Sequence, residues 1–248
     1  MEIEWPEITI GIITFNRPVE IVKTIEALRA NLYYPEDKLH WIISDDASPN
    51  GYLAKLKKQA LFKDIGARFI DTGINSGWGK NANHLLDCVE TDFHLMLEDD
   101  KVLHHPLDLR VGVAAMMEMP YIGMMRYRGT AGDHLILHHM EVNIEKWMPD
   151  YQDGVGAAGH LTYCLLDCGS PALHIYSHGP HLKRRNFHEF YGRYPEGMKL
   201  GQTEEAYAHQ VKDKMRENGA PPIGILPEWI PNYFDDIGQS YQGSEWDK

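Results

Sequence analysis

The first hundred residues alternate between short apolar runs and segments with helical periodicity. The apolar runs are nearly continuous, which is typical of parallel strands covered on both faces. We expect four such strands, at residues 8–15, 39–44, 67–71 and 95–97. The helices between them are predicted to start at Pro18, near Leu53 and after the loop 75–83. Strands that alternate with helices of this length predict a parallel sheet with right-handed crossovers.

The pattern changes after residue 105. A helix at 107–119 and a strand at 121–127 continue the α/β part, and residues 134–142 alternate loosely, as a half-exposed antiparallel strand does. The remaining expected elements are a loop at 150–160, strands at 160–167 and 172–176, and a polar helix at 201–218. An apolar run at 223–226 and the tail 233–240 close the chain. At 248 residues, the chain suits one large domain or a nucleotide-binding half with a second half built against it.

Polar residues follow three of the expected strands at the point where each strand ends. They are Thr14–Arg17, Asp45-Asp46 and the triplet Glu98-Asp99-Asp100. Crossover geometry places these ends at one edge of the sheet, which is where open α/β sheets bind their ligands. With the glycine- and asparagine-rich loop 75–83, the strand ends predict a nucleotide cleft. At this edge the triplet is a candidate for binding a divalent cation and its phosphates, or else it is a solvated acidic turn that closes a strand.

Composition excludes some classes of protein. With 43% hydrophobic residues and no low-complexity tract, the chain is an ordinary globular protein. Its formal net charge of −12 argues against a surface built to neutralise nucleic-acid phosphates. One basic stretch, 181–186, is expected to be a solvated loop, or else to border a phosphate or an acceptor.

Cysteine usage and hydropathy bear on the compartment. Three cysteines form neither a disulfide framework nor a zinc spacing, and buried free thiols are expected. The segment 1–6 is acidic where a signal peptide would be basic, and no apolar stretch approaches the roughly 20 residues that span a bilayer. We expect a cytoplasmic protein without a membrane anchor.

Four motifs together resemble the family 2 glycosyltransferases with the GT-A fold. They are Thr14-Phe15-Asn16-Arg17, Asp45-Asp46-Ala47-Ser48, Asn75-Ser76-Gly77 and the triplet Glu98-Asp99-Asp100. The resemblance covers residues 6–105 well and is weaker later. It implies a single GT-A domain over 1–248: a Rossmann-like, mostly parallel sheet with helices on both faces, and a smaller, antiparallel and loop-rich acceptor part. Residues 6–105 would bind the nucleotide sugar, and residues 106–248 the acceptor.

The resemblance also implies a set of donor-binding residues. In the family, the segment like Thr14–Arg17 and an aspartate like Asp45 or Asp46 hold the base and ribose. The residues that it places around the donor are Thr14, Phe15, Asn16, Arg17, Asp45, Asp46, Asn75, Gly77, Lys80, Asn83, Glu98 and Asp99. Relatives carry Ala-Arg-Asn where this chain has Asn81-Ala82-Asn83, so Lys80 is a candidate for the missing positive charge, or else an ordinary solvated lysine.

The triplet corresponds to the family's D-x-D motif. Its last carboxylate, Asp100, is expected to bind the Mn²⁺ or Mg²⁺ that bridges the donor diphosphate. Glu98 replaces the usual aspartate, and its longer side chain can still reach ribose or a metal-bound water. Some transferases of this fold end in His-Ile-Gly-x-x-Ser, in which the histidine is a third metal ligand. Here the tail reads Asp236-Ile237-Gly238-Gln239-Ser240, and we expect Asp236 either to take the place of that histidine, because oxygen ligands suit a hard cation, or to be an ordinary surface acid.

A catalytic base is expected at the start of the polar helix. Glu204-Glu205 resembles the Glu-Asp pair that supplies the base in inverting members, and Glu205 fills the second place of the pair. Acidic residues in a first helical turn also suit the helix dipole without any catalysis.

By default the donor is a UDP-sugar, and the acceptor is a glycan or small molecule. A modified nucleic-acid base would need a local basic patch such as Lys183–Arg185.

Other functions are weighed against this one. A non-catalytic nucleotide-sugar-binding module would keep the fold without the reaction. A sugar-nucleotide pyrophosphorylase or a Rossmann dehydrogenase would carry a glycine-rich signature after the first strand, where this chain has Thr14–Arg17. The histidines form no zinc-binding pattern. The sequence does not indicate an oligomeric state.

Overall fold

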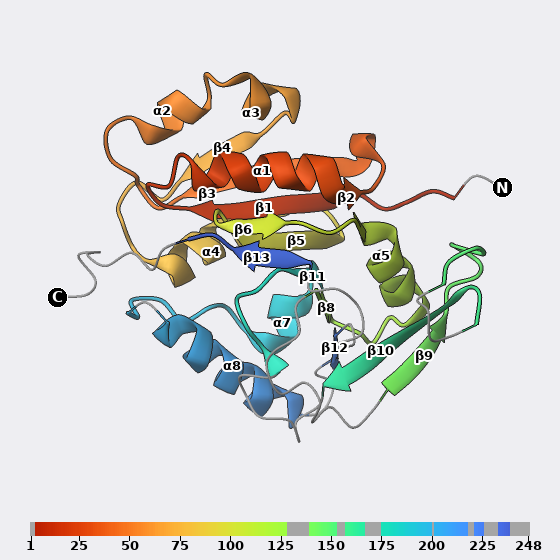
Figure 1. Cartoon of the computed structure of the whole chain (residues 1–248). Coiled ribbons are helices and arrows are strands. Elements are labelled where there is room, and N and C mark those ends of the chain that lie inside the picture. The colour runs from red at the N-terminus through yellow and green to blue at the C-terminus, as the bar shows by residue number, and fades with distance from the viewer. Residues whose placement is uncertain are drawn as a thin grey trace.

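A large central sheet organises the molecule (Figure 1). The computed structural model describes residues 3–127, 139–152, 157–166, 175–199, 201–217, 221–225 and 233–238. Within these ranges the central sheet has nine strands, in the order β4-β3-β1-β5-β11-β8-β12-β10-β9. Their bounds are β1 Ile8–Thr14, β3 Leu39–Asp45, β4 Arg68–Asp71, β5 Phe93–Glu98, β8 Met124–Arg126, β9 His139–Asn143, β10 His160–Leu166, β11 His181–Arg184 and β12 Ile223–Ile225.

The first four strands in this order form the predicted parallel half. β4, β3, β1 and β5 are parallel to one another, and their registers bring the carboxyl ends together, with Thr14 beside Asp45 and Ile13 beside Glu98. The other half is mixed, because β11 is antiparallel to β5 and β8, and β10 is antiparallel to β12 and β9. The polar strand ends therefore do meet at one edge, as the sequence predicts.

Helices cover both faces of the sheet (Figure 1). Both faces of β5 are apolar and need cover. Phe93, Leu95 and Leu97 pack into one apolar cluster, whereas Met96, which points to the opposite face, belongs to a second cluster. The first cluster includes buried residues of α1 and α5, and the second those of α4, α7 and α8. The helix bounds are α1 Glu20–Asn31, α2 Tyr52–Leu56, α3 Ala60–Asp64, α4 Trp78–Asp87, α5 Leu109–Glu118, α7 Phe187–Tyr191 and α8 Gln202–Met215, with a 3₁₀ turn at Glu36–Lys38.

Two small sheets join segments that are distant in the sequence. β2 (Leu32–Tyr33) pairs with β7 (Leu107–Asp108) in parallel. β13 (Phe234–Asp236) pairs with β6 (Lys101–Leu103) in antiparallel, so the end of the chain lies against the segment that follows the acidic triplet. Figure 1 shows β13 beside β6, next to the carboxyl edge of the parallel strands.

Several expected elements differ from the observed ones. The helix predicted at 53–61 is two short helices, α2 and α3, and the strand predicted at 121–127 is confined to β8. Ile175 is helical and Tyr176 lies outside any strand, so the described part of 172–176 is not the predicted strand. Antiparallel pairing is confirmed for the described part of 134–142, in β9. Residues 134–138, 153–156, 167, 172–174, 218, 226, 239 and 240, on which other predictions fall, lie outside the described ranges.

The basic stretch 181–186 is not the solvated loop that we expected. His181–Arg184 form β11, in the middle of the sheet, and the Lys183 side chain is fully buried. Arg184 donates to the carbonyl oxygens of Ile122 and Met119, so it is held by backbone rather than by solvent. The alternative prediction of a local basic patch at Lys183–Arg185 is therefore wrong as well. The Lys183 side chain points into the protein, and the Arg184 side chain is held by backbone carbonyls.

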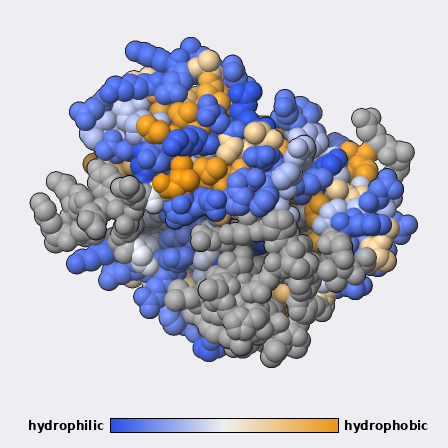
Figure 2. Space-filling model, viewed as in Figure 1, coloured by the Kyte–Doolittle hydropathy of each residue, from blue (hydrophilic) through white to orange (hydrophobic). Residues whose placement is uncertain are grey.

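The surface is mostly hydrophilic in the view of Figure 2. Hydrophilic residues cover most of the described part of this face, and hydrophobic residues gather only in small groups between them. None of the described helices is long and apolar enough to cross a membrane.

Candidate active site

The acidic triplet lies where β5 ends and the chain turns into β6. Glu98 is the last residue of β5, and Lys101 is the first of β6, so the turn presents Asp99 and Asp100 at the carboxyl edge of the sheet. Both aspartates are buried, with 3% and 5% of their surface exposed. Buried carboxylates are strongly disfavoured without partners, so the partners decide what this turn can do.

Asp99 is tied to the end of β1. Its Oδ2 accepts a hydrogen bond of 2.7 Å from Thr14 Oγ1 and one of 3.3 Å from the Phe15 amide. Its carbonyl oxygen accepts a 2.7 Å bond from Thr24 Oγ1 of α1. Burial raises the pKa of Asp99 to about 7, although the bond from Thr14 and the charge of Arg17 act in the opposite direction. Asp99 thus joins two strand ends and a helix at one point.

Arg17 bridges the two aspartates. Its Nη1 lies 3.3 Å from Asp99 Oδ1 and also donates to Asp100 Oδ2. Burial alone would lower the pKa of Arg17, but the charges of Asp99 and Asp100 outweigh burial and raise it. Asn16 adopts a left-handed conformation with φ of 52°, and its amide donates to Ser48 Oγ over 2.7 Å. The segment 14–17 therefore turns sharply between the acidic triplet and the tip of β3.

Lys101 lies among the carboxylates on the other side of the triplet. Its Nζ is 3.0 Å from Glu98 Oε2, 3.0 Å from Asp100 Oδ1 and 2.8 Å from Asp236 Oδ2. Burial would lower the pKa of Lys101, but Glu98, Asp236 and Asp100 together raise it. Burial raises the pKa of Glu98, against the lowering effect of the nearby Lys101. One ammonium group therefore holds three carboxylates together.

The tail reaches this corner, as the sequence predicts for Asp236. β13 pairs Asp236 with Lys101, and the Ile237 amide donates to the Asp100 carbonyl oxygen over 3.0 Å. Gly238 follows directly over the Asp100 side chain: a Cβ added there would lie 1.9 Å from Asp100 Oδ2. Only glycine permits so close an approach. The Ile-Gly pair of the tail element therefore has a local structural reason.

The two aspartates after β3 are engaged with loops. Asp45 Oδ2 accepts a 2.9 Å bond from the Ser48 amide, and burial raises the pKa of Asp45 despite the bonds from Ser48. Asp46 Oδ1 accepts from the Ser76 amide over 2.9 Å, and its Oδ2 from the Gly77 amide over 2.8 Å. Asp46 therefore shapes the glycine- and asparagine-rich loop at the start of α4.

Residues of that loop and of α4 have distinct environments. Gly77 has a φ of 84°, in the region that favours glycine, and Asn75 is half-buried. Asn83 is buried, and its side chain donates to Glu196 Oε1 over 2.8 Å and accepts from the Tyr194 amide over 3.0 Å. Lys80 is exposed on α4. The structure brings Asn83 to a neighbouring loop rather than to the acidic corner.

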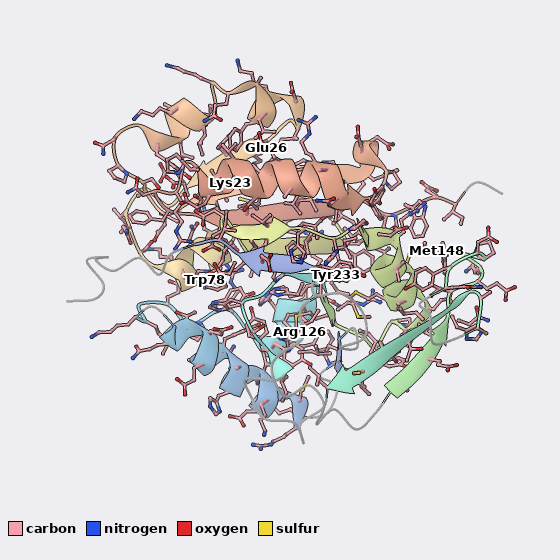
Figure 3. All side chains as sticks on the ribbon, viewed as in Figure 1. Lys23, Glu26, Trp78, Arg126, Met148 and Tyr233 are labelled. Carbon is pink, nitrogen blue, oxygen red and sulfur yellow. The ribbon has the colours of Figure 1, made fainter. Side chains whose placement is uncertain are left out.

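The two glutamates at the start of α8 differ in exposure. Glu204 is half-buried, and its Oε1 accepts a 2.7 Å bond from the His178 amide, whereas Glu205 is exposed. The His178 ring stacks on Trp78 at a centroid distance of 3.5 Å, which joins α4 to the segment before β11. Figure 3 shows Trp78 at the beginning of α4, on the side that faces α8. No pattern in the sequence indicates this stacked pair.

The chemistry of the acidic corner fits a hard divalent cation. Glu98, Asp100 and Asp236 offer only carboxylate oxygens, the ligands that Mg²⁺ and Mn²⁺ prefer. Asp100 Oδ1 is buried and has no partner with hydrogen-bond geometry among the described residues. In their present positions, no three described side chains of His, Cys, Asp or Glu are arranged to hold a metal ion. The Lys101 ammonium instead lies between the three carboxylates.

Comparison with known proteins identifies related chains. The family described as Glycosyl transferase family 2 matches residues 9–170. No curated protein matches the chain. Among solved structures, S. aureus TarS is similar, at 15% identity and a TM-score of 0.64, over 92% of this chain and 36% of TarS.

Shorter solved structures are similar too. The structure of TarS 1–349 in complex with UDP-GlcNAc has 15% identity and a TM-score of 0.64, over 97% of this chain and 60% of that one. The mannosyltransferase PcManGT from Pyrobaculum calidifontis, in complex with GDP-Man and Mn²⁺, has 14% identity and a TM-score of 0.56, over 90% of this chain and 55% of that one. The chain thus spans less than two thirds of these proteins, and the likeness shows a shared GT-A fold.

A buried group of basic side chains lies beneath the site, on the α4 and α8 face of the sheet. Lys183 Nζ contacts Tyr194 Oη at 2.5 Å and His188 Nε2 at 3.0 Å. His94, its neighbour across β5 and β11, is buried, and neither ring nitrogen has a hydrogen-bond partner among the described residues. Burial lowers the pKa values of Lys183 and His94, and the charge of Lys183 lowers that of His94 further.

We expect His94→Leu to raise the free energy of unfolding by about 1 kcal/mol at pH 7, because leucine removes a buried imidazole without partners. The unfolded histidine binds a proton below about pH 6.5, whereas the folded one does not, so wild-type stability falls as the pH falls. The variant should weaken that fall between about pH 6.5 and 5 by up to about 1.4 kcal/mol per pH unit. Urea titrations at several pH values test this. A loss of stability at pH 7 would contradict it.

Proposed function

Because this chain belongs to glycosyl transferase family 2, we propose that it transfers a sugar from a nucleotide diphosphate to a hydroxyl group of an acceptor. One observation carries the proposal: the acidic triplet, Arg17 and the tail residue Asp236 meet at the carboxyl edge of the parallel strands. That edge is where open α/β sheets bind nucleotides. A glycan or a small molecule is the proposed acceptor class. Lys183 is buried and so does not contribute to the local basic patch that a nucleic-acid acceptor would need.

The donor nucleotide is proposed to bind between the ends of β1 and β3 and the loop 75–83. Thr14–Arg17 and Asp45 are the proposed contacts on the strand side, and Asp46 holds the loop through the amides of Ser76 and Gly77. Asn75, Lys80 and Asn83 complete the proposed set, with Asn83 acting through the loop that it anchors. UDP is the proposed nucleotide, in line with the UDP-GlcNAc complex of TarS, and GDP is the alternative that the PcManGT complex supports.

Asp100, Glu98 and Asp236 would hold the divalent cation. When bound, Mn²⁺ or Mg²⁺ would stabilise the negative charge that develops on the leaving diphosphate. Asp99 would not coordinate directly, because its carboxylate is held by Thr14, Phe15 and Arg17. Its role would be to fix the turn that presents Asp100.

The proposed reaction is a direct displacement with inversion. The acceptor oxygen attacks the anomeric carbon, and the bond from that carbon to the diphosphate oxygen breaks, with its electron pair remaining on the diphosphate. A carboxylate takes the proton from the acceptor hydroxyl, so no covalent nucleophile is needed. Glu205 is exposed to solvent, whereas Glu204 is anchored on the His178 amide. We therefore assign the base to this pair, with Glu205 first.

A donor screen tests the function. The screen starts with the UDP-sugars. We expect one nucleotide sugar to raise the melting temperature of the protein only when Mn²⁺ is present, because a ligand that binds the folded state stabilises it. Mass spectrometry should then detect release of the nucleotide with an accepted acceptor. Stabilisation by one donor without hydrolysis or transfer to any acceptor would instead favour a non-catalytic binding module. No stabilisation by any donor would contradict the proposal.

Asp236→Asn is expected to weaken Mn²⁺ binding by at least roughly 10–100-fold, because loss of a mere supporting partner of a metal ligand has that effect and Asp236 is proposed as a ligand itself. Its neighbour Asp235 provides a matched control, because its carboxylate lies 3.2 Å from His104 Nδ1 and not at the acidic corner. Asp235→Asn should therefore leave the metal affinity unchanged. Calorimetric titration of both variants measures this. Equal affinities in the two variants would remove Asp236 from the metal site.

Glu205→Gln is expected to lower kcat about 10²–10⁴-fold while donor affinity stays the same, because glutamine cannot take the acceptor proton. Glu204→Gln provides the comparison, and we expect a smaller loss from a shifted His178 loop. Donor binding by calorimetry and transfer by mass spectrometry separate the two effects. If both variants kept near-normal transfer, the base would not be in this pair.

A further inference from the structure

Lys101 lies where the proposed divalent cation would bind. Its Nζ lies within 3.0 Å of an oxygen of Glu98, of Asp100 and of Asp236, the three carboxylates that would hold the metal. The residue is 5% exposed, and β6 fixes its backbone by pairing it with Asp236. The Asp236 side chain is 46% exposed, but those of Lys101 and Asp100 are only 6% exposed, so the arrangement is more than a surface ion pair, whose side chains would be mobile and screened.

The charges at this corner explain why a cation is held there. Four acidic side chains, Glu98, Asp99, Asp100 and Asp236, surround two basic ones, Arg17 and Lys101. Arg17 neutralises the side of Asp99 and Asp100 that faces β1, and Lys101 neutralises the side that faces the tail. Removal of one partner from a buried ion pair leaves an uncompensated charge and is strongly destabilising. Without a metal, Lys101 therefore has a structural task.

We propose that Lys101 is an internal cation that occupies the metal position and that a divalent metal displaces when it binds. The inference rests on the proposed metal-dependent function. An ammonium and a divalent ion cannot both sit between the same three carboxylates, because they would repel each other at contact distance. Lysine suits this task, because its compact charge sits on a flexible four-carbon stem that can swing away. Arg17 does not, because it holds the aspartates from the β1 side.

Displacement by the metal would also determine the new position of the Lys101 ammonium group. Once its three partners coordinate a metal, the ammonium is released beside the position proposed for the donor diphosphate. A cationic donor suits phosphate oxygens. The same side chain would thus stabilise the metal-free corner and then contact the donor, so metal and donor would assist each other's binding.

The test compares Mn²⁺ binding by wild type, Lys101→Met and Lys23→Met, without donor. Lys23 is exposed on the outer face of α1, as Figure 3 shows, so its variant changes the net charge equally without touching the corner. We expect Lys101→Met to bind Mn²⁺ roughly tenfold more tightly than wild type by calorimetry. Its melting temperature should be lower than that of wild type in EDTA and rise more on addition of Mn²⁺. Lys23→Met should match wild type in both.

The outcomes separate this inference from the function on which it rests. Equal or weaker Mn²⁺ binding by Lys101→Met would overturn the displacement while leaving the metal site intact. Failure of both wild type and Lys101→Met to bind Mn²⁺ would overturn the proposed metal dependence itself. If Lys101→Met does not fold in EDTA, Lys101→Arg provides the second variant. The Lys101→Arg variant keeps the positive charge, so it should bind Mn²⁺ no more tightly than wild type does. Tighter binding by this variant would overturn the inference.

Discussion

The structure depends on the neutralisation of four carboxylates at one edge of a sheet. Parallel strands bring their carboxyl ends together, so polar residues that follow β1, β3 and β5 must share a small volume. Buried charges of one sign are tolerated only when opposite charges and hydrogen bonds compensate them. Arg17 and Lys101 supply the charges, and Thr14 and Thr24 supply hydrogen bonds to Asp99. Thr14, Arg17 and Thr24 come from one segment between the end of β1 and the first turns of α1, whereas Lys101 comes from β6.

This compensation couples the two halves of the molecule. β13 carries Asp236 to Lys101, and Gly238 passes over Asp100 at a distance that no other residue would allow. Away from the acidic corner, the side chain of Asn83 in α4 accepts a hydrogen bond from the Tyr194 amide, and that of Glu204 in α8 accepts one from the His178 amide. The division at residue 105 that the sequence suggests is therefore not a division of the structure, because the contacts of β13 and of Asn83 cross it. Residues of the second half complete the edge that the first half forms.

Much of the fold of residues 6–105 follows from the sequence alone. Apolar runs with helical patterns between them determine a parallel sheet almost without tertiary information, and polar residues at the strand ends then indicate the edge that binds ligands. The tail was predictable because the Asp236-Ile237-Gly238 pattern resembles a known element, and the structure does place Asp236 against the triplet. Whether it holds a metal stays a prediction. The short strands β8 and β12 and the split of the second helix depend on tertiary packing, which propensities do not record.

Charged residues were the least predictable feature, because charge normally indicates exposure. Lys183 and Lys101 are both buried lysines, yet their surroundings differ in sign. Lys183 lies among tyrosine and histidine side chains, and burial lowers its pKa, whereas Lys101 lies among carboxylates that raise its pKa. A buried lysine without acidic partners tends towards the neutral form, and one with three of them remains a cation. In the sequence, Lys101 follows an acidic triplet and Lys183 lies in a basic stretch. Only the fold reveals which of the two lysines keeps its charge.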